Sequence, residues 1–215
     1  MALDSYSALL ASIASWLHRP DLASQCPDFV TLAETQMNRR LRVRPMVTRE
    51  ALTVSAEFTD LPSDFLVERT LTLASTPPVD VEFANPDILD QTAWPQQPAG
   101  IPQIAAVVGT QLRVNPVPDQ AYSGHLTYFA KIPPLATNPT NWLLAAHPDV
   151  YLYGALTQSA PFLRDDARVD LWGGLFKAGL DDIQAKYGER SGRLLTVDAG
   201  LRPRRPFNIQ IGDYV

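Results

Sequence analysis

The stretch that decides the fold is Pro148-Asp149-Val150-Tyr151-Leu152-Tyr153-Gly154-Ala155-Leu156, followed by Leu163-Arg164-Asp165-Asp166 and then by Trp172. Proline suits the first position of a helix, and the apolar residues after it recur at helical spacing. Pro161 ends or kinks this helix, and Asp165 or Asp166 is suited to cap a second one. The stretch contains no nucleophile, no metal-ligand spacing and no phosphate-binding loop. It predicts a packing surface rather than a catalytic site.

The second of these helices is long and carries apolar residues three and four positions apart, at Val169, Trp172, Phe176, Leu180 and Ile183. Gly188 fits the position just past its end. Three glycines inside it, at positions 173, 174 and 179, each cost about 1 kcal/mol against alanine. Close approach of another helix is the compensation that we expect.

Two further helices are predicted at the start of the chain. The first runs from about Ser5 to His18 and is capped by Asp4 or Ser5; the second begins at Pro27 and ends at Arg44-Pro45. Their apolar stripes predict one helical core together with the later pair. Its expected members are Trp16, Phe29, Leu32, Tyr151, Leu156, Trp172 and Phe176.

The middle of the chain is rich in proline, with thirteen of the 19 prolines between Pro62 and Pro148. Proline is excluded from helix interiors and from central strands, so this region predicts strands and turns. Residues 66–73 and 125–129 are expected strands, and residues 104–108 and 111–114 form an expected hairpin turning at Gly109. Five or so short strands suggest a small sheet or sandwich.

The fold class is therefore α+β: a helical bundle of two N-terminal and two C-terminal helices, an inserted β region and an extended tail. Residues 1–48 and 140–190 form the expected helical core, residues 49–139 the β insert and residues 191–215 an extended arm.

Composition narrows the function. A net charge of −5 and a pI of about 5.1 argue against a dedicated nucleic-acid binder. The single cysteine, Cys26, excludes an internal disulfide and suits a reducing compartment. The start of the chain lacks the basic segment of a signal peptide, and no apolar run is long enough for a bilayer. We expect a protein that folds in cytoplasm and makes no membrane contact.

Three blocks of sequence stand out between Tyr6 and Leu180, in the order PDFVTLAETQMNRRLRVRPM, LPSDFLVERTLTL and NWLLAAHPDVYLYGAL…LRDDARVDLWGGLF. Together they resemble the head-to-tail adaptor (connector) proteins of tailed bacteriophages. The resemblance implies a structural virion protein in the neck, in a ring of about twelve copies beneath the portal. It also implies contacts with portal, tail or neck proteins and with neighbouring copies, and double-stranded DNA passing through the centre without sequence-specific binding.

An arginine cluster lies at the end of the second predicted helix, at Arg39, Arg40, Arg42 and Arg44, with Arg49 beyond it. Three interpretations stay open. The cations could favour the helix dipole in solvent, at about 0.3–1 kcal/mol each. They could pair with Asp165, Asp166 or Asp170 of a neighbouring copy, or they could touch DNA phosphates in the channel.

The tail predicts an arm that docks on the portal. Phe207, Ile209, Ile211 and Tyr214 alternate as in a strand, while Pro203 and Pro206 exclude a helix. Such a segment can add a strand to a partner's sheet. Arg202, Arg204 and Arg205 are placed to pair with acidic groups beside that sheet. The alternative is that the tail folds back on the chain's own β insert.

No enzyme activity, cofactor or metal is expected. The alternatives are a small hydrolase that uses helix carboxylates, such as Asp165-Asp166 or Asp181-Asp182, and a basic-patch nucleic-acid-binding module. Adjacent carboxylates diverge on a helix, and the three histidines lack metal-ligand spacing. The adaptor is the preferred function, and we expect a monomer or weak oligomer that forms a ring only on the portal.

Overall fold

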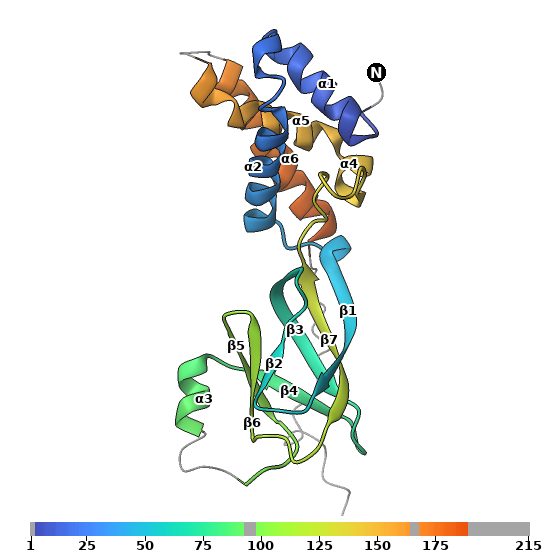
Figure 1. Cartoon of the computed structure of the whole chain (residues 1–215), viewed down its shortest axis with the longest axis vertical. Coiled ribbons are helices and arrows are strands. Elements are labelled where there is room, and N and C mark those ends of the chain that lie inside the picture. The colour runs from blue at the N-terminus through green and yellow to red at the C-terminus, as the bar shows by residue number, and fades with distance from the viewer. Residues whose placement is uncertain (1–2, 93–97, 164–167, 189–215) are drawn as a thin grey trace, which may run out of the picture.

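The chain folds into a helical part and a sheet part, arranged one above the other along the longest axis (Figure 1). This computed structural model describes residues 3–92, 98–163 and 168–188. Each part has its own cluster of buried apolar side chains. The α+β class predicted from the sequence is confirmed.

The helical part is built from both ends of the described chain. Its elements are α1 (Tyr6–Leu17), α2 (Cys26–Arg40), α4 (Trp142–Ala146), α5 (Pro148–Gln158) and α6 (Arg168–Tyr187), with short 3-10 turns at Pro20–Leu22, Arg44–Met46 and Ala160–Phe162. The Ser5 hydroxyl caps α1 by accepting from the Ala8 amide, and His18 ends α1 in the left-handed conformation with φ of 52°. The bounds predicted for this first helix are confirmed.

Helix α5 occupies the centre of the helical part, because α1, α2, α4 and α6 all contact it. Gly154 lets α5 pack closely against both α6 and α2. A Cβ atom at this position would lie 2.8 Å from Cε2 of Phe176 on α6 and 3.2 Å from Cβ of Ala33 on α2. Gly179 permits a second approach, since its Cβ would lie 2.7 Å from Cγ2 of Val150. The expected close contact is thus confirmed at Gly179, whereas Gly174 faces open space.

The sheet part is one curled sheet of seven strands rather than a sandwich. Its strands are β1 (Val47–Val54), β2 (Phe58–Asp60), β3 (Phe65–Leu73), β4 (Val79–Phe83), β5 (Ile104–Val108), β6 (Gln111–Asn115) and β7 (Tyr122–Ala130), in the order β1-β7-β3-β4-β5-β6-β2. Only β4 and β5 pair in parallel, and α3 (Pro86–Thr92) packs beside β5. The predicted hairpin is confirmed, with Gly109 at φ of 64° in its turn.

Four details differ from the sequence prediction. Trp16 and Leu32 are 45% and 49% exposed and lie outside the core, whereas Phe29, Tyr151, Leu156, Trp172 and Phe176 are buried as expected. Helix α2 ends at Arg40, because Leu41 is already extended, and not at Arg44-Pro45. Strand β1 begins at Val47, two residues before the start predicted for the β insert, because its pairing with β7 starts there. Finally, the sheet has seven strands and not about five.

Candidate interaction surfaces

The arginine cluster lies where the helical part meets the sheet part. Arg39 and Arg40 form the last turn of α2 and are exposed. The Arg42 guanidinium donates from Nη1 to the carbonyl oxygens of Asn38 (2.7 Å) and Leu41 (2.5 Å). Carbonyls at a helix C-terminus lack partners within the helix, so a cation satisfies them. Arg42 therefore makes the contacts of the helix-end interpretation. Arg39 and Arg40 are exposed and could contact a neighbouring copy or DNA phosphates.

Beside this cluster is a groove of about 430 Å³ between α2 and the sheet part. It is lined by Thr35, Asn38, Arg39, Arg42, Leu66 and Lys131. Lys131 donates from Nζ to the Ser63 carbonyl at 3.2 Å. Among the residues that the structure describes, none of the three cations forms a salt bridge with a carboxylate. The groove thus presents positive charge without an internal counter-ion.

Of the acidic residues proposed to pair with this cluster in a neighbouring copy, the structure describes Asp170. Asp170 is exposed in the first turn of α6. The Arg42 backbone instead exchanges two 3.3 Å hydrogen bonds with Gln184, fourteen residues further along α6, or about 21 Å away. The structure therefore does not bring Asp170 to the arginines within one chain. Asp165, Asp166 and the predicted arm residues at positions 202–214 lie outside the described residues.

A buried polar network holds the two parts together, and the sequence analysis missed it. Glu34 of α2, 6% exposed, accepts from the Leu135 amide at 2.8 Å and from the Tyr151 hydroxyl at 3.4 Å. Asn141 donates to the Tyr151 oxygen at 2.7 Å and caps α4 by accepting from the Leu144 amide. Asn38 accepts from the Ile132 amide at 2.9 Å. One face of α2 thus fixes the chain as it leaves β7 for α4.

Burial raises the pKa of Glu34, and the hydrogen bonds from Leu135 and Tyr151 oppose that rise without cancelling it. Burial also raises the pKa of Tyr151, to which the nearby Glu34 adds. The available sequence signal was the place of Glu34 directly after Ala33, inside the apolar stripe of α2. A carboxyl group buried there destabilises the folded protein unless it has a hydrogen-bond partner.

The pH dependence of stability tests this network. Because the pKa of Glu34 is higher in the folded chain than its ordinary 4.5, the folded state binds this proton more tightly. Its contribution to stability is therefore present below pH 4.5 and falls as pH rises through the raised pKa. We expect Glu34→Gln to flatten the dependence of unfolding free energy on pH in this window, measured by urea titration.

The control is Glu34→Ala, which leaves the buried Leu135 amide without its acceptor. Such a loss costs about 1–3 kcal/mol at every pH. A Glu34→Gln protein whose stability falls with pH as steeply as that of the parent would contradict the role given to Glu34.

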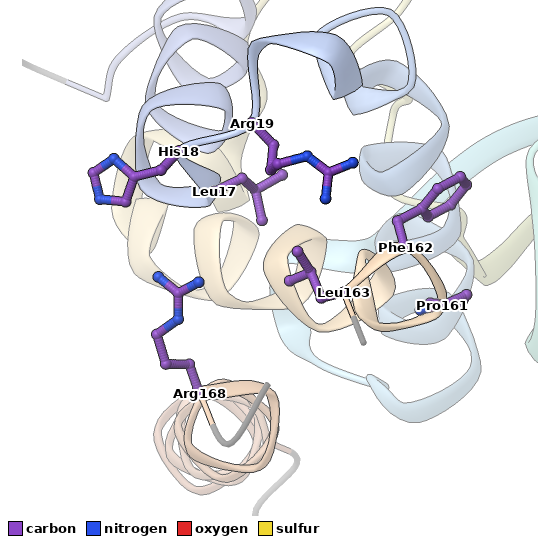
Figure 2. A pocket seen from close by; sticks show the side chains of 7 residues that line it. All are labelled: Leu17, His18, Arg19, Pro161, Phe162, Leu163 and Arg168. Carbon is purple, nitrogen blue, oxygen red and sulfur yellow. The ribbon is translucent and has the colours of Figure 1, made fainter. Parts of the chain in front are cut away.

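A second opening lies at the far end of the helical part, where α1 ends and α6 begins (Figure 2). Its lining residues are Leu17, His18, Arg19, Pro161, Phe162, Leu163 and Arg168, around a volume of about 700 Å³. Arg19 is paired with Asp21 through bonds of 2.8 and 2.6 Å, and Arg168 lies 5.2 Å from the centre of the Trp172 ring. The lining has no nucleophile paired with a base, so it offers no catalytic arrangement.

The described residues contain no group of three or more His, Cys, Asp or Glu side chains placed to hold a metal ion. None of the described helices combines the length and apolar character that a membrane span requires. What the structure does present are uncompensated cations and exposed apolar side chains on helix faces. These features are typical of an assembly protein.

Comparison with known families agrees with this class. A family model described as SU10 adaptor protein matches residues 4–203, most of the 215-residue chain. The chain belongs to this family of phage head-to-tail adaptors, and the resemblance inferred from the sequence is confirmed. A comparison with curated proteins finds no match. Family membership assigns a structural adaptor role and speaks against the hydrolase alternative.

Proposed function

We propose that this chain is a ring-forming adaptor in the neck of a phage particle, between the portal and the tail. The observation that carries the proposal is the family match over residues 4–203, which runs through both the helical part and the sheet part. In this proposal about twelve copies continue the portal channel, and the lower rim of the ring presents a docking surface for tail or neck proteins. Double-stranded DNA passes through the centre.

Charge supports a channel through which DNA slides. The chain carries a net charge of −5, whereas tight phosphate binding needs many cations and slows release. The arginine cluster and the acidic residues Asp165, Asp166 and Asp170 are proposed as separate sites, at copy–copy contacts or along the channel. Within one chain Asp170 lies in the first turn of α6, whereas Arg42 contacts Gln184 in its last turn.

We propose that three regions of the chain have different roles in the assembly. Residues 1–48 and 140–190 form the ring-building core, residues 49–139 the second layer and residues 191–215 the arm. Gly188, the last described residue, pairs with Val43 at the junction of the two parts. From there the apolar side chains of Phe207, Ile209, Ile211 and Tyr214 would dock on the portal, beside contacts made by Arg202, Arg204 and Arg205.

Truncation after Ser191 tests the arm. We expect the shortened protein to melt cooperatively at nearly the temperature of the full chain, because the described residues before position 189 already form two buried clusters. Binding to portal rings, followed by co-sedimentation, is expected to be lost. A truncated protein that loses stability but still binds the portal would reject the arm and favour a tail that folds back on the sheet.

The assembly itself is tested by light scattering and electron microscopy of the full chain with and without portal rings of the same virus. We expect a monomer or weak oligomer alone and a closed ring on the portal, since the template raises the local concentration of copies. A stable ring at micromolar concentration without portal would reject the template dependence, and no binding to the portal would reject the adaptor function.

A further inference from the structure

Two helices of this chain carry exposed strips of the same layout, one ending in a cation and the other in a carboxylate. On α2 the exposed residues Leu32, Thr35 and Arg39 form one face, called here the basic α2 face. On α6 the exposed residues Leu175, Ala178 and Asp182 form another, called here the acidic α6 face. Residues three and seven positions apart lie on the same side of a helix, so each set is a continuous strip.

In a single chain the leucines of both strips are exposed to solvent and their charges have no salt-bridge partner among the described residues. Leu32 is 49% exposed and Leu175 is 41% exposed, and Leu171, one turn before Leu175, is 62% exposed. In the described parts of the chain neither Arg39 nor Asp182 takes part in a salt bridge. Leucines gathered on a helix beside a free charge are typical of a protein contact surface.

The spacing within the strips matches. In each strip a leucine is followed three positions later by a small residue and seven positions later by a charge. Seven residues of helix rise about 10 Å. When the two helices lie side by side in the same direction, leucine therefore meets leucine, Thr35 meets Ala178, and the Arg39 guanidinium meets the Asp182 carboxylate.

The two strips also lie at matching heights in the chain. Both helices run toward the sheet part (Figure 1), and Arg42, two residues past the end of α2, is hydrogen-bonded to Gln184 in the last turn of α6. From this shared point the chain leads back to Arg39 over a rise of about 8 Å, because two of the three steps are extended, and back to Asp182 over a rise of about 3 Å. The strips are level to within about one helical turn.

From these matches we infer that the acidic α6 face of one copy packs on the basic α2 face of the next copy in the ring. The inference rests on the proposed function, because it needs a ring. The inference places the ring axis along the direction in which both helices approach the sheet part, and rotation about that axis keeps every residue at its height. Strips that are level in one chain are therefore level between neighbours, and no sliding is required.

This contact is heterologous, because it joins two different surfaces of the same chain. A heterologous contact repeats from copy to copy and closes a ring when the rotation closes. Two copies of the same face placed side by side would instead bring like charges together. The basic α2 face therefore favours an acidic partner surface of the kind that every copy carries.

Disulfide crosslinking tests the contact. In a Cys26→Ala background, which removes the single buried cysteine, Leu32→Cys and Leu175→Cys are combined in one chain. On portal rings, mild oxidation is expected to give a ladder of crosslinked copies on a denaturing gel. The control combines Leu32→Cys with Val108→Cys, which is 40% exposed but lies on β5 in the sheet part. It is expected to give no ladder.

Charge reversal supplies a second measurement. Arg39→Asp or Asp182→Arg alone is expected to lower the amount of chain assembled on portal rings, and the two together are expected to restore it. Rings that form normally by electron microscopy but give no ladder from the Leu32–Leu175 pair would overturn this inference and leave the proposed function intact. Crosslinks from Leu175→Cys to the portal instead of another copy would also overturn it. A chain that never assembles on the portal would overturn both.

Discussion

Trp172→Ala is expected to destabilise the protein by about 3–5 kcal/mol, because it empties the space of a large aromatic side chain in the core. Trp172 is 3% exposed and belongs to the buried cluster that joins α2, α5 and α6. Arg168 lies over its ring and would lose that contact too. Urea denaturation should show a lower midpoint with little change in slope.

The control for this substitution is its neighbour, Leu171→Ala. Leu171 is 62% exposed, and surface substitutions of this kind change stability by about 0.5 kcal/mol or less. Equal losses from the two substitutions, or an unchanged midpoint for Trp172→Ala, would show that α6 does not pack as described.

Gly154→Val is the second large effect, expected to cost about 1–3 kcal/mol through overpacking. Its first side-chain carbon would lie 2.8 Å from the Phe176 ring on one side and 3.2 Å from Ala33 on the other, so neither neighbour can give way without moving a helix. Thermal melts of the purified chain provide the measurement.

Gly174→Ala is the matched control, because it also replaces a glycine inside a helix. Its Cβ would meet no atom within 4 Å, so the substitution should stabilise the protein by up to about 1 kcal/mol through helix propensity alone. The opposite signs expected at positions 154 and 174 are diagnostic. A Gly154→Val protein as stable as the parent would contradict the close crossing at α5.

Local signals in the sequence predicted most of the elements. Ser5 before an apolar repeat, Pro148 at the start of α5 and Gly109 between two alternating runs each act within a few residues, and each is confirmed. The order β1-β7-β3-β4-β5-β6-β2 could not be obtained in this way. It depends on pairings between distant segments, including the single parallel pair β4–β5, and alternation does not specify partners.

Periodicity also failed to decide which apolar side chains reach the core. Trp16 and Leu17 are adjacent in α1, yet Leu17 is 1% exposed and Trp16 packs at the surface, edge-on to Tyr153 at 6.2 Å. On α2 the adjacent residues Leu32 and Ala33 differ in the same way, since Leu32 is exposed and Ala33 is buried. An apolar stripe wider than the contact with α5 leaves its margin in solvent, and only the packed neighbours set that margin.

The sequence by itself determined the class of the elements, the division into helical ends and a strand-rich middle, and the family, since propensity, caps and residue blocks are local properties. Only the tertiary structure decided where charges and apolar side chains meet. It placed Glu34 beside Leu135 and Tyr151, more than a hundred positions away, and separated Asp170 from the arginines. Such relations arise from the crossing of helices on α5, which no single segment encodes.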